Sequence, residues 1–370
     1  MMTLANRLAL LLILLLFSCS SPQKEIVSIK GSTMGTTYNV KFFPLTNNPI
    51  EIEDNYILIE KILKDINQQM STYIPSSEIS TFNQLESTDW FVISEDFSNV
   101  VEQSFKYYDL SDGQYDITVM PLVNLWGFGP DIFESPPSKA MIDSVKTFIG
   151  QHLIDIENQK IRKKDSRVQI DLSSIAKGYA VDKIFNALNR YDDLFIEIGG
   201  EIRTKSKSKD WKIGINTPSI TNFENDIELI ITLNNLSIAT SGNYRKFSLD
   251  SQTGERYVHT INPITGFTSK NNILSVSVIS EDCITSDAWA TALLSLDLER
   301  GRTIIDQKES NSLMYLPLDK IIQQSASGRS SDNGSNRGAN LQNNRSASDV
   351  INSIKEQSRG SFSGRDRGER

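Results

Sequence analysis

The chain is short of the residues that make covalent cross-links and zinc sites. Its 370 residues include only two cysteines, Cys19 and Cys283, and two histidines, His152 and His259. Their positions show none of the spacings of zinc ligands. A protein that uses Cys19 as a membrane anchor keeps one thiol, which cannot form an internal disulfide. The fold must therefore rest on its hydrophobic core.

An excess of positive charge is also missing. The chain has 38 lysines and arginines against 46 aspartates and glutamates, a formal net charge of −8. No basic stripe interleaved with aromatic residues is present before the C-terminal tail, which argues against a nucleic-acid-binding surface. With 38% hydrophobic residues, a chain of this length is large enough for a full-sized core.

No hydrophobic run is long enough to span a bilayer as a stable helix. The longest, residues 8–17, follows Arg7 and ends in Leu16-Phe17-Ser18-Cys19, which resembles a bacterial lipobox. We therefore expect residues 1–18 to be a signal peptide, Cys19 to carry acyl chains, and residues 19–30 to link this anchor to the fold. The protein would then face the periplasm from one of the membranes of a bacterial cell envelope. The alternative is a plain secretory signal with an incidental cysteine.

Hydrophobic periodicity between residues 31 and 322 predicts helices and strands without a long linker. A strand or hairpin is predicted at residues 31–43, and helices at 52–70, 95–110 and 138–149. Segments rich in β-branched residues predict strands at 194–198, 211–215, 227–233, 236–240 and 273–279. This arrangement indicates an α+β fold. From residue 323 to 370 Ser, Asn, Gly and Arg replace almost every large apolar residue, so we expect a disordered tail.

One segment, residues 168–184, combines a strand, a carboxylate and a helix start. Apolar residues alternate over 168–172, which predicts a half-buried strand with Asp171 at its end, and a helix follows a Ser173-Ser174 start signal. The free N–H groups of a helix N-terminus suit phosphate, and Asp171, Ser174 and Lys177 bring a cation ligand, a hydroxyl and a positive charge to the same place. An ordinary capped helix would show the same pattern.

A second segment, residues 286–294, is a strong helix former. Its Asp287 and Thr291 are four residues apart, which places a carboxylate and a hydroxyl on one helix face. Hard divalent cations prefer such oxygen ligands. An aspartate in the first turn of a helix is also a common partner of the helix dipole, so the pair alone does not establish a metal site.

Four further motifs, in this order, are similar to those of the FAD:protein FMN transferase family, the ApbE lipoproteins. They are Gly31-Ser-Thr-Met-Gly-Thr-Thr-Tyr38, the segment 113–130, Ile198-Gly-Gly-Glu-Ile202 and His259-Thr-Ile-Asn-Pro-Ile-Thr-Gly266. The resemblance covers approximately residues 31–318. It implies a single ApbE-like domain at residues 31–322, with mixed or antiparallel sheets and packed helices.

The resemblance also implies a site in which FAD lies in a cleft. The residues that would contact or stand near FAD are Met34, Tyr73, Tyr115, Asp116, Ile117, Asp171, Lys177 and Ile261. A magnesium ion would be held around Ser174, Asp287 and Thr291. The family differs at the position of Ser174, so whether its hydroxyl or a backbone oxygen would meet the metal stays open.

The implied reaction moves FMN from FAD to a threonine or serine hydroxyl of a client protein and releases AMP. A base must take the hydroxyl proton, and His259 is the first candidate because an imidazole titrates near pH ~6.5. Asp287 is the second candidate, although a carboxylate that binds a metal accepts protons poorly. His259 could instead be a structural residue that positions its loop.

Two other functions remain open from the sequence: a metal-dependent FAD pyrophosphatase that uses water, and a non-catalytic flavin-binding lipoprotein. The end of the domain also departs from the family. Residues 312–316 are followed by Pro317 and soon by the polar tail. A missing last strand would leave a sheet edge open.

Overall fold

The structure is a computed structural model. It describes residues 25–46, 48–129, 135–218, 227–244, 247–250, 253–269, 273–308, 314–319 and 345–346, the last two segments without side chains. The predicted signal peptide, Cys19, the first part of the linker and almost all of the tail lie outside these residues. None of the described helices is both long and apolar enough to cross a membrane.

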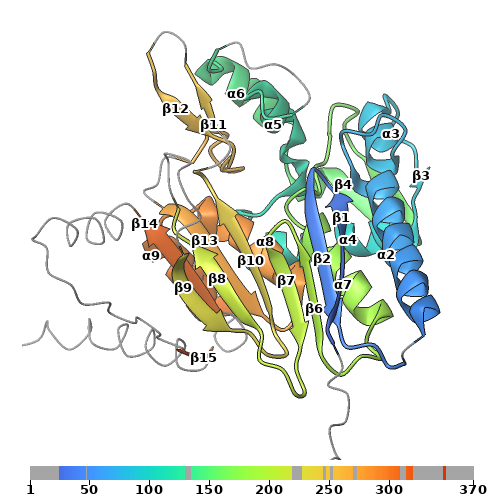
Figure 1. Cartoon of the computed structure of the whole chain (residues 1–370). Helices are drawn as coiled ribbons and strands as arrows, with labels where there is room; N and C mark the ends of the chain where they lie inside the picture. The colour runs from blue at the N-terminus through green and yellow to red at the C-terminus, as the bar shows by residue number, and fades with distance from the viewer. Residues whose placement is uncertain are drawn as a thin grey trace, which may run out of the picture.

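A seven-stranded antiparallel sheet forms the centre of the molecule (Figure 1). In spatial order its strands are β1 (Val27–Thr33), β2 (Thr36–Phe42), β6 (Leu194–Ile198), β7 (Glu201–Lys205), β10 (Ser237–Gly242), β13 (Ile273–Ser280) and β14 (Met314–Asp319). The turn between β1 and β2 consists of Met34 and Gly35, both with positive φ (49° and 71°). Two such residues suit the twist of a tight hairpin, and the turn holds Met34 at the end of the sheet.

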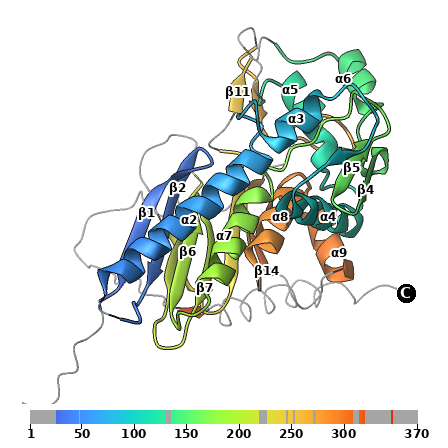
Figure 2. The ribbon, with the colours of Figure 1, turned by 90° about the vertical axis from the view of Figure 1, so that its right-hand side faces the viewer.

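Helices cover one face of this sheet (Figure 2). They are α2 (Pro49–Met70), α3 (Glu78–Gln84), α4 (Glu95–Leu110), α7 (Ala176–Ala187), α8 (Cys283–Leu294) and α9 (Leu298–Lys308). In α2, Ile59, Leu63, Ile66 and Met70 recur at helical spacing and are all buried in the main core. Helix α8 lies mostly buried between α7 and strands β10 and β13.

The opposite face of the sheet carries a second, smaller core. There β8 (Lys212–Asn216) and β9 (Ile227–Thr232) form a hairpin whose Ile213, Ile215 and Ile231 pack with Phe195 and Trp211. A third sheet is made by β3 (Phe91–Val92), β5 (Lys160–Lys163) and β4 (Ile154–Glu157), with the short helix η2 (Gln151–Leu153) before it.

A group of short elements stands above one end of the main sheet in both views (Figures 1 and 2). This small lobe contains η1 (Ile117–Val119), α5 (Met120–Leu125), α6 (Lys139–Lys146) and the hairpin of β11 (Phe247–Leu249) and β12 (Arg256–Val258). It has a core of its own, formed by Leu122, Trp126, Phe128, Ile142, Tyr257 and Ile261. The molecule is therefore a single α+β domain with antiparallel sheets and packed helices, as predicted.

The strand predicted at residues 168–172 is wrong. Val168, Ile170 and Leu172 are buried, as the alternation indicated, but the segment joins no sheet. The side chain of Asn83 replaces the neighbouring strand, since its Oδ1 accepts from the N–H of Ile170 and its Nδ2 donates to the carbonyl, both at 2.8 Å. An extended segment can thus satisfy its backbone groups outside a ladder.

The predicted helix start is also displaced. Helix α7 begins at Ala176, and Ile175 precedes it without a side-chain cap. The two serine hydroxyls are used elsewhere: that of Ser173 donates to Asp171 (2.7 Å) and that of Ser174 to Tyr115 (3.0 Å). The serines therefore bind neighbouring site residues in place of the helix end.

The open sheet edge expected after residue 316 is filled. Strand β14 pairs with β13 along its length, with Pro317 opposite Val276. A proline fits because β14 is the last strand of the sheet in the described part of the chain, and one side of an edge strand needs no ladder hydrogen bonds. In the tail, β15 (Arg345–Ser346) pairs in parallel with β9.

Candidate functional site

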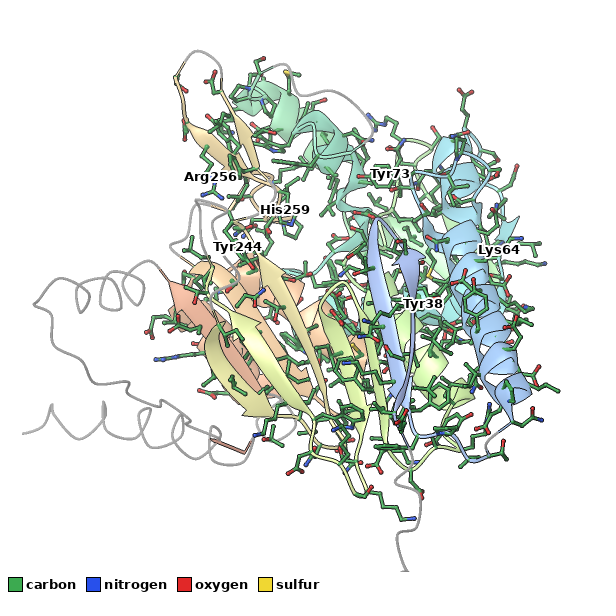
Figure 3. The ribbon with its side chains drawn as sticks, viewed as in Figure 1. Tyr38, Lys64, Tyr73, Tyr244, Arg256 and His259 are labelled. Carbon is green, nitrogen blue, oxygen red and sulfur yellow. The ribbon has the colours of Figure 1, made fainter. Side chains whose placement is uncertain are left out.

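A cavity of about 1000 Å³ lies between one end of the main sheet and the small lobe. Figure 3 shows Tyr73 on one side of this opening and His259 and Tyr244 on the other, and all three line the cavity. The lining brings together almost every residue expected at the site: Met34, Tyr73, Tyr115, Asp116, Asp171, Ser174, Lys177, His259, Ile261, Asp287 and Thr291. These residues come from segments that are far apart in the sequence.

Three charged residues, Lys177, Glu201 and Asp287, form what we call the cleft floor. Lys177 on α7 binds Oε1 of Glu201 through its ammonium group, which also lies 3.9 Å from Oδ1 of Asp287 on α8. Both carboxylates are nearly inaccessible to solvent. The floor therefore concentrates two acids and one cation in a buried position.

Helices α7 and α8 approach closely enough to share a hydrogen bond at this point. The N–H of Gly178 donates to Oδ2 of Asp287 at 2.9 Å. A Cβ atom at residue 178 would lie 2.5 Å from the carbonyl oxygen of Cys283 and 2.8 Å from Cβ of Asp287. A glycine is therefore needed here for the two helices to meet.

Burial sets the protonation of the floor. Removal from water is the main cause that raises the pKa of Asp287 to about 7; the nearby Glu201 adds to this effect, and the attraction of Lys177 opposes it. Burial also raises the pKa of Glu201. For Lys177, burial acts to lower the pKa, but the two carboxylates outweigh it and raise the pKa above its usual value. The lysine thus stays charged at neutral pH.

Tyr115 and Asp171 extend the polar surface along the cavity. The phenol of Tyr115 is buried, and desolvation raises its pKa, so it remains a neutral hydrogen-bonding group beside Ser174. Asp171 accepts from both the N–H and the hydroxyl of Ser173, and its own N–H donates to the carbonyl of Ile117 at 2.8 Å. The acid is thus held at the cavity edge with its side chain half-exposed.

Asp116 is an acid of a different kind. It is buried, its Oδ1 accepts from the N–H and the hydroxyl of Thr118 at 2.8 and 2.6 Å, and burial raises its pKa to about 6. The hydroxyl of Thr118 in turn accepts from the N–H of Gly150. Asp116 therefore lines the cavity and also fixes the loop at which the small lobe begins.

The upper wall of the cavity belongs to the small lobe. The indole N–H of Trp126 donates to the carbonyl of Gly266 at 2.9 Å, which ties helix α5 to the loop that carries His259 and Ile261. The ring of Phe128 contacts the imidazole of His259 edge to face, with centroids 6.4 Å apart. His259 is half-buried and lines the cavity opposite the floor.

A comparison with protein families identifies the chain. The model of the ApbE family matches residues 34–316, which include every lining residue named above. The chain belongs to the ApbE family.

Curated members of the ApbE family match over most of their length. The FAD:protein FMN transferase of Vibrio cholerae is 36% identical over 328 residues, which cover 86% of this chain and 96% of that protein. The FAD:protein FMN transferase of Haemophilus influenzae is also 36% identical, over 312 residues that cover 81% and 89% of the two chains.

Solved structures of the ApbE family share the fold. The flavin transferase ApbE of Vibrio cholerae superposes with a TM-score of 0.71 at 36% identity and covers 80% of this chain and 94% of its own. The apo form of the Pseudomonas stutzeri flavinyl transferase ApbE has a TM-score of 0.70 at 28% identity, with 83% and 98% covered.

Two residues differ from the site that the ApbE resemblance implies. Ile117 is buried beneath the cavity without lining it, and its carbonyl is engaged by Asp171. Glu201, in contrast, lines the cavity and was assigned no role from the sequence. Its motif was noticed, but only the fold brings the start of β7 against Lys177. Its Oε2 is buried and has no hydrogen-bond partner among the residues that the structure describes.

The side-chain oxygens of Asp287 and Thr291 fit a hard divalent cation. Asp287 and Thr291 face the cavity from successive turns of α8, and the Thr291 hydroxyl lies 3.3 Å from that of Ser241. Within the described residues no three His, Cys, Asp or Glu side chains are grouped so that they could hold a metal ion on their own. A cation that also takes hydroxyl, substrate and water ligands suits the set.

Proposed function

We propose that this member of the ApbE family is an FAD:protein FMN transferase that moves FMN from FAD to a threonine or serine hydroxyl of a client protein. The observation that carries the proposal is the placement of Asp287, Lys177 and His259 around one cavity. Its volume, about 1000 Å³, is at the upper end of small-molecule sites and suits a dinucleotide. The names of the curated relatives support the same reaction.

FAD would lie across the cavity between the hairpin turn and the small lobe. Met34 and Tyr73 offer apolar surface at one side, and Ile261 offers it at the other. Tyr115, Asp116 and Asp171 supply hydrogen-bonding groups between them. The charge of Lys177 would face the pyrophosphate, where a fixed cation offsets negative charge that develops during transfer.

Asp287 and Thr291, with the hydroxyl or a backbone oxygen of Ser174, would hold magnesium. Such an ion supplies neutralisation of phosphate charge and alignment for in-line attack. The buried, oxygen-only donor set supports this assignment. Asp287 is then a ligand, which leaves His259 as the base.

His259 would take the proton of the client hydroxyl at a ring nitrogen. The hydroxyl oxygen then forms a bond to the FMN phosphorus while the bond from that phosphorus to the AMP oxygen breaks. AMP leaves, and the FMN phosphate is left esterified to the client. The position of His259 on the lobe, opposite the floor, supports an approach of the client from the open side of the cavity.

Incubation of the full chain with FAD, magnesium and a threonine-bearing flavin-accepting domain tests this function. The expected result is a client whose mass rises by one FMN residue, with AMP as the second product. Free FMN and AMP with every client unmodified would replace the transferase with a pyrophosphatase. FAD that binds but stays intact would indicate a non-catalytic flavin-binding protein.

The lipid anchor at Cys19 is a further part of the proposal, and the lipobox-like tetrapeptide supports it. The transfer reaction would then take place on the periplasmic side of the cell envelope. Substitution Cys19→Ser should release the protein from membranes, since the acyl chains supply the binding energy of such anchors. Equal partitioning of variant and wild type into detergent would contradict the anchor.

A further inference from the structure

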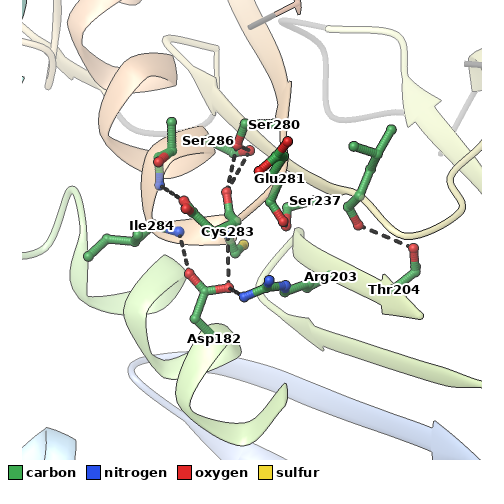
Figure 4. Close-up of polar contacts among 12 residues, drawn as sticks. Asp182, Arg203, Thr204, Ser237, Ser280, Glu281, Cys283, Ile284 and Ser286 are labelled. Carbon is green, nitrogen blue, oxygen red and sulfur yellow. Dashed lines mark hydrogen bonds and ion pairs between the residues drawn. The ribbon is translucent and has the colours of Figure 1, made fainter. Parts of the chain in front are cut away.

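Helices α7 and α8 exchange hydrogen bonds at two levels, and only one level touches the cavity. At the first level the N–H of Gly178 donates to Asp287. One turn further along α7, Asp182 accepts from the N–H groups of Cys283 and Ile284, both at 2.9 Å (Figure 4). Each helix thus supplies an aspartate that binds backbone N–H groups of the other.

The carboxylate of Asp182 is buried and fully engaged. Its Oδ1 also accepts from Nη1 of Arg203 at 2.7 Å (Figure 4). The guanidinium group of Arg203 lies over the ring of Phe185 at 4.0 Å. The first N–H groups of any helix have no partner within it. Here Asp182 satisfies two of them, and the Asp282 side chain satisfies a third, that of Thr285, at 2.9 Å. The start of α8 is therefore held in one place.

The two levels are coupled by their spacing. Gly178 and Asp182 are four residues apart on α7, and Cys283 and Asp287 are four residues apart on α8. No side chain separates the helices at Gly178, so a movement of the start of α8 cannot be absorbed there. Asp287 would move with it, away from the N–H of Gly178 and from Lys177.

We propose that Asp182, which does not line the cavity, is a positioning residue for the transferase site: it fixes the start of α8 and thereby the place of Asp287 beside Lys177. This inference rests on the proposed function only in calling the cavity a transferase site. Loss of the hydrogen bonds between Asp182 and the start of α8 should weaken divalent-cation binding at Asp287 and Thr291, although no cavity residue is substituted.

Substitution Asp182→Asn tests the proposal in the full-length protein. The amide turns one acceptor into a donor that faces an N–H group or Arg203. Mn²⁺, which takes the same oxygen ligands as magnesium, serves as the probe, and its EPR signal reports the bound fraction without any turnover. We expect the Mn²⁺ dissociation constant to rise by roughly 10-fold, equivalent to about 1.4 kcal/mol. High metal concentration should restore FMN transfer to near the wild-type rate.

Asp96→Asn is the matched control. Asp96 on α4 also binds α7, through the hydroxyl of Tyr179 (2.6 Å) and the ammonium group of Lys183, and neither of these partners belongs to α8. We expect it to lower the unfolding temperature by a similar amount and to leave Mn²⁺ affinity unchanged. Equal Mn²⁺ affinity of Asp182→Asn and wild type, or equal loss in both variants, would overturn the positioning role.

Arg203→Gln covers the case in which Asp182→Asn does not fold. It leaves the two backbone hydrogen bonds of Asp182 in place and removes the counter-charge, the hydrogen bond from Nη1 and the contact with Phe185. A loss of about 3-fold in Mn²⁺ affinity is expected; no loss would overturn the proposal. Wild-type protein that binds no Mn²⁺ would overturn it as well. If the wild-type protein binds Mn²⁺ but transfers no FMN, the proposed function is wrong and the positioning role of Asp182 still stands.

Discussion

The two walls of the cavity are built in opposite ways. The floor stands on α7 and α8, which are packed into the main core and joined by buried hydrogen bonds. The small lobe has six residues in its core and exposes Met141, Phe247 and Leu249 to solvent. Small cores contribute little stability, so the lobe should open more readily than the floor. The proposed metal ligand Asp287 and the charged Lys177 therefore lie on the more stable wall. The proposed base, His259, lies on the small lobe, which should open more readily.

The largest effect is expected at the floor. Asp287→Ala should abolish FMN transfer, a loss beyond ~10⁴-fold, because it removes the carboxylate that would hold the metal. Mass spectrometry of the client measures this loss. Asp282→Asn, which keeps the cap of the same helix outside the cavity, should retain most activity. Activity in Asp287→Ala would move the metal site away from α8.

On the lobe, His259→Ala should slow transfer by roughly 10²–10⁴-fold, the effect of a lost general base. FAD affinity, measured by flavin fluorescence, should change little. The second histidine, His152, does not line the cavity, and His152→Ala serves as the control. Full transfer by His259→Ala would leave the enzyme assignment in place and reduce the histidine to a structural residue.

The junction between the two walls should show a pH effect on stability. Asp116 has a pKa of about 6 in the fold against ~3.9 in an unfolded chain, so its contribution is present below pH ~4 and is lost as the pH rises through 6. Asp116→Asn should remove this dependence, roughly 2 kcal/mol between pH 4 and pH 8. Urea unfolding at both pH values measures it.

A second aspartate, Asp155, provides a control for the direction of this pH effect on stability. Neighbouring Lys164 and Arg162 lower the pKa of Asp155, so its stabilising contribution is lost as the pH falls. Asp155→Asn should therefore alter the pH dependence in the opposite direction. A pH profile that is the same in Asp116→Asn and wild type would show that the buried carboxyl is not the source.

The smallest effect is expected within the lobe. Trp126→Phe keeps the aromatic packing but removes the hydrogen bond to the carbonyl of Gly266, leaving a buried acceptor unpaired. Transfer should fall by roughly 10-fold through looser placement of His259, while global thermal unfolding changes little. A large drop in unfolding temperature would mean that the lobe and the floor unfold as one unit, and the contrast between them would fail.

Local patterns in the sequence predicted the elements well where one face is buried. Residues 52–70 fall within α2, and Asp287 and Thr291 lie on one face of α8, because helical spacing alone decides both. The strand at 168–172 was wrong because alternation reports burial and not the identity of the hydrogen-bond partner. Asn83 lies far away in the sequence, and no local signal points to it.

The site was predicted in part for the same reason. Motifs that resemble the ApbE family identified the residues that line the cavity, whereas spacing alone identified only the pairs within one element. The contact between Lys177 and Glu201 joins a helix to the start of a strand and depends on the sheet order. The bond from Asp182 to the start of α8 is likewise a product of tertiary packing.

Helix α8 has a consequence for the slowest motions of the molecule. Most of its residues are buried, and the N–H groups at its start are all engaged by Asp182 and Asp282. Its amide protons should therefore be among the last to exchange with deuterium, after those of β11, β12 and α6. The cleft floor should stay folded while the small lobe opens locally. A large molecule can then enter and leave the cavity without disturbing the positions of Asp287 and Thr291.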